Sequence, residues 1–146
     1  MNIRLTKTEE PKPLTILHLE GKMDGSNYTN LIEKAKEQYL AGERHLLIDL
    51  RQLTFISSAG LAGIHQVGLL FRGIEETSLD EGWAAYRSID RYRQQGMNAR
   101  VKLLAPEGEV RKVLEISGFN TLFEVFKNYD QAINAFFLEQ PSYLDA

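Results

Sequence analysis

The side chains best placed for chemistry in this sequence belong to two adjacent serines, Ser57 and Ser58. They follow a near-continuous apolar run, 46–50, and a pattern of helical spacing begins directly after them. A helix N-terminus carries free N–H groups and the positive end of the helix dipole. A phosphate can be bound there or attached covalently to a hydroxyl. The serine pair therefore predicts a site of reversible modification.

A purely structural role is also expected for one of the two serines. One hydroxyl caps the helix that begins near Ala59, an interaction that contributes about 1 kcal/mol. Capping does not explain two hydroxyls followed by two small residues, Ala59 and Gly60, which would leave the backbone open to a partner. A phosphate would be tolerated by the helix end, but an unpaired charge buried in an interface costs several kcal/mol. The pattern thus predicts a modification that blocks binding and spares folding.

Other catalytic patterns are absent from the sequence. The three histidines, His18, His45 and His65, are scattered and lack the spacing of metal ligands. There is no cysteine, no G-x-S-x-G and no phosphate-binding glycine motif. Asp49 is expected to be structural, its carboxylate binding the loop backbone. We therefore expect no enzyme activity, no metal and no cofactor.

Composition limits the class of protein. A chain of 146 residues suits one domain, 1–146, with a short tail at 140–146. The 17 basic and 20 acidic side chains give a net charge of -3, which argues against nucleic-acid binding. No apolar run is long enough for direct membrane insertion, and the N-terminus lacks the apolar region of a signal peptide. These features favour a cytoplasmic protein.

Alternating strands and helices are predicted to position the serines. Such alternation implies an α/β fold with right-handed crossovers, in which a mixed, mainly parallel sheet of about five strands is covered by four or five helices. The expected order is a strand at Ile3–Leu5, a hairpin strand at Leu14–Glu20, a helix presenting Leu31, Ile32, Ala35 and Tyr39, a buried strand at His45–Leu50, a helix to about Phe71, a strand at Arg100–Leu104, a helix from Pro106 to Gly118, a strand at Leu122–Phe126 and a helix capped by Asp130 that runs to about Phe137.

A segment at about 74–96 interrupts this alternation. Ser78–Glu81 has the form of a capping box and predicts an extra helix near 78–95. Trp83 and Tyr86 would share one face of it. That face either packs on the core of the domain or forms a secondary interface with a partner or a second copy.

Asp24 is a further candidate site residue, in the loop between the second strand and the first helix. The carboxyl ends of neighbouring parallel strands lie at one edge of a sheet, where ligands and partners bind. This topology predicts that Asp24 lies close to Ser57 and Ser58. The alternative role for Asp24 is that of a helix N-cap or turn residue.

The order of these motifs resembles the STAS domain, the family of the bacterial anti-sigma factor antagonists and their relatives. The resemblance is carried by Gly21–Asp24, Leu47–Leu50, Phe55–Leu61 and Val110–Phe119, and extends from about Ile3 to Phe137. It implies a STAS-like domain without enzymatic activity. Such a domain binds an anti-sigma factor, often itself a serine kinase, and so regulates transcription.

The resemblance also implies a site. Alignment on Gly60 and Leu61 places the phosphorylated serine at Ser58, with Ser57 as the alternative, and Asp24 matches an acidic residue near the partner surface. This chain has Ser57 where many members have an acidic residue, and Ala59 where many have a second hydroxyl. The partner-binding residues implied are Asp24, Ser57, Ser58, Ala59, Gly60 and Leu61.

Other functions and partners stay open at this point. A STAS-type scaffold or companion subunit of a transport complex would act by assembly without a phosphoswitch. A nucleotide or small ligand at the loop edge is a third hypothesis. A phosphatase and a homodimer are further interactions compatible with the first.

Overall fold

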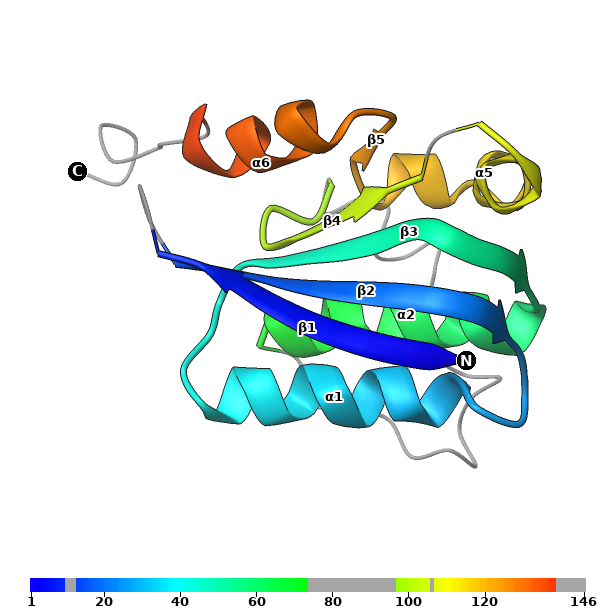
Figure 1. Cartoon of the computed structure of the whole chain (residues 1–146), viewed down its shortest axis with the longest axis horizontal. Helices are drawn as coiled ribbons and strands as arrows, with labels where there is room; N and C mark the ends of the chain where they lie inside the picture. The colour runs from blue at the N-terminus through cyan, green and yellow to red at the C-terminus, as the bar shows by residue number, and fades with distance from the viewer. Residues whose placement is uncertain (10–12, 74–96, 106, 139–146) are drawn as a thin grey trace.

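A mixed sheet of five strands organises the part of the chain described by the computed structural model, which is all of 1–146 except 10–12, 74–96, 106 and 139–146 (Figure 1). Its strands lie side by side in sequence order. The first pair is antiparallel and the other pairs are parallel. The strands are β1 (Asn2–Thr8), β2 (Leu14–Met23), β3 (Leu46–Ile56), β4 (Val101–Leu104) and β5 (Val125–Phe126).

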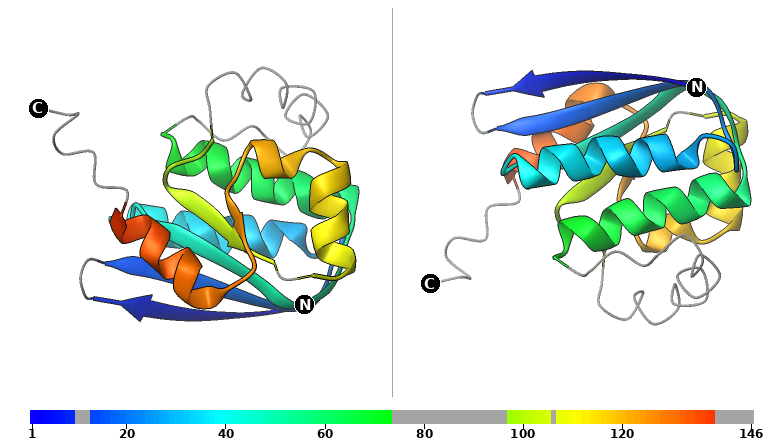
Figure 2. Two further views of the ribbon diagram at one scale, coloured as in Figure 1. Left: turned by 90° about the horizontal axis from the view of Figure 1, so that it is seen from above. Right: turned by 90° about the horizontal axis from the view of Figure 1, so that it is seen from below.

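Helices cover both faces of this sheet (Figure 2). On one face α1 and α2 lie side by side, and α5 joins the same core; on the opposite face α6 lies over β4 and β5. The described helices are α1 (Tyr28–Leu40), α2 (Ser58–Phe71), α5 (Glu109–Ile116), α6 (Tyr129–Leu138) and the short 3-10 helix η2 (Phe119–Thr121).

Two apolar clusters follow from the alternation of side chains along the strands. Leu17 and Leu19 of β2 enter the larger cluster under α1 and α2, whereas Leu14 and Ile16 enter the smaller one under α6. The first half of β3, 46–50, is buried on both faces, as a central parallel strand requires.

The predicted fold class is confirmed: the described residues form an α/β fold with a five-stranded mixed sheet and four α-helices. The helix face predicted from Leu31, Ile32 and Ala35 is buried in α1. Two predicted glycine stops, Gly42 and Gly118, have positive φ angles of 101° and 81° just after α1 and α5.

Several predicted boundaries are wrong. The strand predicted at His45–Leu50 extends to Ile56, because Leu53 and Ile56 are buried and the extension pairs with β2. The strand predicted at Leu122–Phe126 is only Val125–Phe126, since Leu122 and Phe123 turn into the core after η2.

Two helix starts also differ from the prediction. The helix expected from Pro106 begins at Glu109, and Pro106 itself lies outside the described residues. Asp130 lies inside α6, whose first turn is capped by Asn128: the Asn128 Oδ1 atom accepts from the Gln131 N–H at 3.1 Å.

Some predictions fall on residues that the structure does not describe. They are the extra helix near 78–95, its Trp83 and Tyr86, and the tail at 140–146. The assignment of 1–146 to one domain therefore stays a prediction. Within the described ranges, no helix combines the length and the apolar composition that crossing a membrane requires.

Gly68 lets α2 approach its neighbours closely. A Cβ atom at Gly68 would lie 2.7 Å from Phe123 Cζ and 3.1 Å from Asn98 Nδ2. Phe123 is only 2% exposed, and the Asn98 side chain donates to the Gly68 carbonyl at 2.9 Å and accepts from the N–H groups of Arg100 and Val101. Phe123 is held in the core and Asn98 by three hydrogen bonds, so neither side chain can shift without losing contacts.

We predict that Gly68→Ala destabilises the protein by roughly 1–3 kcal/mol, as overpacking does. Helix propensity alone would give the opposite sign, since alanine exceeds glycine by about 1 kcal/mol. Urea unfolding measures the difference. Gly25→Ala is the matched control, because its Cβ would meet its nearest neighbour at an ordinary 4.0 Å. A more stable Gly68→Ala variant would contradict the packing described.

Candidate functional site

The candidate site lies on an extension of the two longest strands. β4 ends at Leu104, opposite Asp49, and β1 begins opposite Glu20. Beyond these levels β2 and β3 continue as a pair to Met23 and Ile56. We call residues 21–23 and 53–56 the tip; it is the right-hand end of β2 and β3 in Figure 1. The loops that follow both strands leave from it.

Ser57 and Ser58 have different environments at the end of the tip. The Ser57 N–H donates to the Met23 carbonyl at 2.9 Å, and the Ser57 Oγ atom accepts from the Gly60 N–H at 3.2 Å. Ser57 is therefore the N-cap of α2. Ser58 is the first residue of the helix, one position earlier than predicted, and it is exposed. One serine holds the helix and the other offers its hydroxyl to solvent.

The small residues after the serines serve the packing of the tip. A Cβ atom at Gly60 would lie 2.7 Å from Ile56 Cγ1 and 3.2 Å from the Met23 carbonyl oxygen. Gly60 therefore lets α2 pack on the strands, rather than opening the backbone to a partner as the sequence suggested. Leu61 is also buried, at 4% exposure, whereas Ala59 is half-buried. Gly60 and Leu61 can position this site but offer little surface.

Asp24 lies beside the serines, as the topology predicted. Met23 pairs with Ile56, so Asp24 and Ser57 are the next residues of adjacent strands. A Cβ atom built on Gly25 would lie 4.0 Å from the Ala59 Cβ, so the loop after β2 reaches the first turn of α2.

Asp24 is a turn residue, one of the two structural roles considered for it. Its Oδ1 atom accepts from the Ser26 N–H at 2.9 Å and from the Ser26 hydroxyl at 2.6 Å. These hydrogen bonds from Ser26 lower the pKa of Asp24 below its ordinary value, so the carboxylate is charged at neutral pH. The N-cap position of α1 belongs to Asn27.

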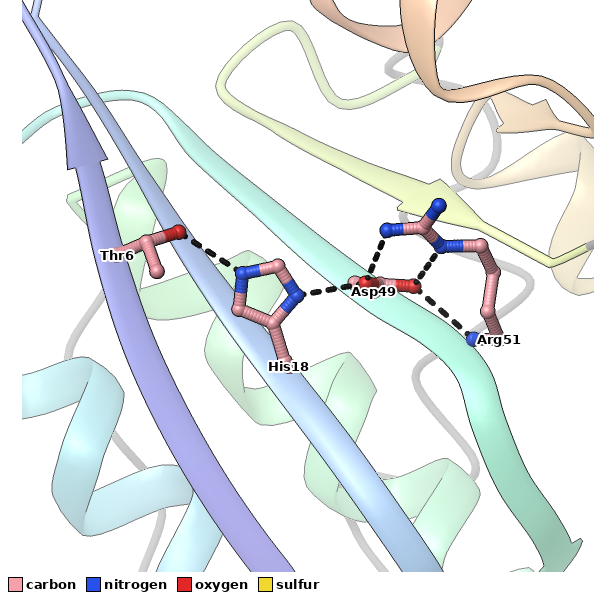
Figure 3. Close-up of polar contacts among 4 residues, drawn as sticks. All are labelled: Thr6, His18, Asp49 and Arg51. Atoms are coloured by element: carbon pink, nitrogen blue, oxygen red, sulfur yellow. Dashed lines mark hydrogen bonds and ion pairs between the residues drawn. The ribbon is translucent and has the colours of Figure 1, made fainter.

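A second group of polar residues crosses the sheet just before the tip (Figure 3). The Thr6 hydroxyl lies 2.8 Å from His18 Nε2, and His18 Nδ1 lies 2.6 Å from Asp49 Oδ2. Arg51 donates to Asp49 from its backbone N–H, Nε and Nη2 at 3.0, 3.0 and 2.9 Å. These contacts link β1, β2 and β3 laterally.

Asp49 is structural, as expected, but not through the loop backbone: it lies within β3 and binds two side chains and one N–H of its own strand. Burial raises its pKa, and hydrogen bonds from Arg51 and His18 outweigh that effect, so the pKa of Asp49 lies below its ordinary value. An ionised Asp49 requires the hydrogen of the His18 ring on Nδ1. The sequence pointed to this cluster only weakly, through a charged residue within a buried strand.

The order hydroxyl, imidazole, carboxylate in Thr6, His18 and Asp49 is also that of a hydrolase triad. Catalysis further needs a substrate cavity with oxyanion donors beside the hydroxyl. One cavity of the described structure is water-sized and lined by His65, Gly68 and Phe123, and another of about 270 Å³ is lined by Met1, Ile3 and α1. Neither of these two cavities borders Thr6 or the two serines. We assign the Thr6–Asp49 link to stability because its hydrogen bonds join β1, β2 and β3.

Comparison with known proteins points to one family. The STAS domain family model matches residues 4–72, the range from β1 through α2 that holds Asp24, Ser57 and Ser58. A protein of Bordetella bronchiseptica, BtrV, is named as a candidate anti-sigma factor antagonist. It is 28% identical to this chain over 123 residues, which cover 84% of this chain and 86% of that protein.

Two solved structures share the fold. An anti-sigma factor antagonist from Mycobacterium paratuberculosis superposes with a TM-score of 0.64 at 14% identity, covering 93% of this chain and 95% of the other. The unphosphorylated form of the anti-sigma factor antagonist SpoIIAA gives a TM-score of 0.53 at 14% identity, covering 95% of this chain and all of the other, 100%. At these identities the likeness is one of fold.

The separate environments of the two serines predict separate effects on stability. Ser57→Ala removes the cap of α2 and is expected to lower the free energy of unfolding by about 1 kcal/mol. Ser58→Ala removes an exposed hydroxyl and should change it by less than about 0.5 kcal/mol. Urea unfolding of both variants measures these values. Equal losses in the two variants would contradict the assignment of the cap to Ser57.

The position of Asp49 predicts a pH-dependent loss of stability. Because its pKa is lower in the folded protein, its contribution is complete above its unfolded pKa of about 3.9 and is lost as the pH falls through the folded value. Asp49→Asn should therefore cost roughly 1.5–3 kcal/mol at pH 7, and this difference from wild type should shrink below about pH 4.

The measurement is urea unfolding of wild type and Asp49→Asn between pH 3 and 7. Asp130→Asn is the control, because Asp130 is exposed and should show a small effect across this range. A pH-independent difference between wild type and Asp49→Asn would show that the charge of Asp49 does not act as described.

Proposed function

We propose that this chain is an anti-sigma factor antagonist of the STAS family whose binding is controlled by phosphorylation of Ser58, because residues 4–72 match the STAS domain family model and the described residues share the SpoIIAA-like fold. One observation carries the proposal most directly. Ser58 presents an exposed hydroxyl at the first residue of α2, while Ser57 beside it is engaged as the cap.

The choice of Ser58 over Ser57 follows from the hydrogen bonds. A phosphate on Ser57 Oγ would disturb the bond to the Gly60 N–H that caps α2. A phosphate on Ser58 would sit at the positive end of the helix dipole and leave that cap in place. The fold is therefore expected to accept modification at Ser58 more readily than at Ser57.

The effect on a partner is electrostatic. The charged Asp24 already lies beside Ser58, and a phosphate on Ser58 adds nearly two further negative charges. A partner surface packed against Ser58 would have to desolvate them without a matched cation, at a cost of several kcal/mol. A cost of that size weakens binding by orders of magnitude.

The proposed partner is an anti-sigma factor. If it is itself a serine kinase, it would also phosphorylate Ser58, and a phosphatase would reverse the modification. The protein itself acts by binding. The docking edge consists of Asp24, Ser57, Ser58 and Ala59. The buried Gly60 and Leu61 pack beneath this edge and position it.

We predict that Ser58→Asp keeps its fold and loses the partner, with affinity reduced tenfold or more, whereas Ser58→Ala binds as wild type does. Wild type and both variants serve as paired baits in native cell lysate. Circular dichroism and urea unfolding check the fold. Isothermal titration with the recovered partner then measures affinity.

A kinase-type anti-sigma factor held by wild type and Ser58→Ala but lost by Ser58→Asp is the expected result. The same scaffold or transport proteins on all three baits would contradict the proposal. In that case Ser58 would be no switch, and the chain would act as an assembly module.

A further inference from the structure

The outer face of the tip carries an aromatic side chain that the core does not use. Met23 and Ile56 are buried in the larger cluster, so the paired residues before them, Lys22 and Phe55, point to the opposite face of the sheet. Both are exposed, and the exposed fraction of Phe55 is 47%. An open aromatic ring thus lies directly across from a lysine.

The described strands and helices leave this pair at the surface, with 47% of Phe55 exposed. β1 and β4 end before the level of Phe55. α5 packs on β3 in the larger cluster, on the opposite face, and the contacts of α6 include β4, β5 and Arg51 (Figure 1). The preceding outer-face pair, Glu20 and Gln52, is polar and exposed, which shows that the fold tolerates polar side chains here. The aromatic ring is therefore a surface feature that packing does not demand.

The distance from Phe55 to the serines makes it part of any ordinary interface there. Phe55 precedes Ser58 by three residues, which corresponds to about 10 Å along an extended strand. A stable protein interface buries about 800 Å² on each partner, a patch of about 16 Å radius. A partner centred on Ser58 would reach Phe55, and aromatic side chains are enriched among the residues that dominate such interfaces.

The charge beside Phe55 indicates the chemistry of the contact. Lys22 is exposed, and it is the residue that pairs with Phe55 across β2 and β3. A partner element with an apolar side chain and a neighbouring carboxylate would complement both residues of the pair.

We propose that Phe55 and Lys22 extend the docking surface from the Asp24–Ser58 edge onto the outer face of the tip. They take the same protein partner through an apolar side chain flanked by a carboxylate. The inference rests on the proposed function, since it assumes a partner that covers Ser58. It adds a binding contact that phosphorylation does not alter chemically.

The test begins with the serine-kinase partner that the wild-type bait recovers. The purified partner is titrated separately with wild type, Phe55→Ala and Lys22→Glu, and the three affinities are compared. Each variant is expected to bind at least tenfold more weakly, and the loss for Lys22→Glu should diminish at high salt. Leu40→Ala is the matched apolar control, because Leu40 is 76% exposed at the far end of α1 from Asp24. It should bind within twofold of wild type.

Unfolding midpoints separate lost binding from lost structure. Phe55 is half-exposed, so the Phe55→Ala variant should stay folded. Lys22→Glu changes an exposed side chain outside the core and tests the same surface independently. Wild-type affinity in both variants, together with lost binding in Ser58→Asp, would overturn this inference alone. If wild type recovers no such kinase and Ser58→Asp changes nothing, the proposed function falls and the inference falls with it.

Discussion

The parallel pairing of β2 with β3 is the constraint on which the other features depend. It runs from Thr15 and Leu46 to Met23 and Ile56, through two irregularities of register. Its register decides which side chains enter each apolar cluster. Its last pair also sets the loops of Asp24 and Ser57 next to each other. A shift by one residue would exchange the two faces and separate the core from its helices.

A charged link supports this pairing on the less covered face. The apolar pattern excludes a shift by one residue, but a shift by two would keep every side chain on its face. Asp49 accepts from His18 of β2, and this bond is lost if β2 and β3 slide; the hydrogen bonds from Arg51, which lies on the same strand, keep the Asp49 carboxylate in place. The Arg51 guanidinium also lies 5.2 Å from the centre of the Tyr129 ring, which brings α6 into contact with the same link.

The sequence predicted the sheet class, most elements and the closeness of Asp24 to the serines, because these follow from periodicity and from the rule that parallel strands end together. It did not predict that β3 extends to Ile56. Residues 51–56 mix polar and apolar side chains, and only pairing with β2 shows them to be strand. The burial of Gly60 and the bonds of Asp49 were equally out of reach, since both depend on neighbours distant in the chain.

The division of labour between Ser57 and Ser58 bears on how this surface can evolve. Proteins lie only slightly above the stability that function requires, so a regulatory residue that also holds the fold can hardly vary. Here the cap belongs to Ser57 and the exposed hydroxyl to Ser58. Substitutions at Ser58 can therefore be sampled by drift at little cost to stability, so the proposed control at this helix could be gained, lost or retuned on the same scaffold.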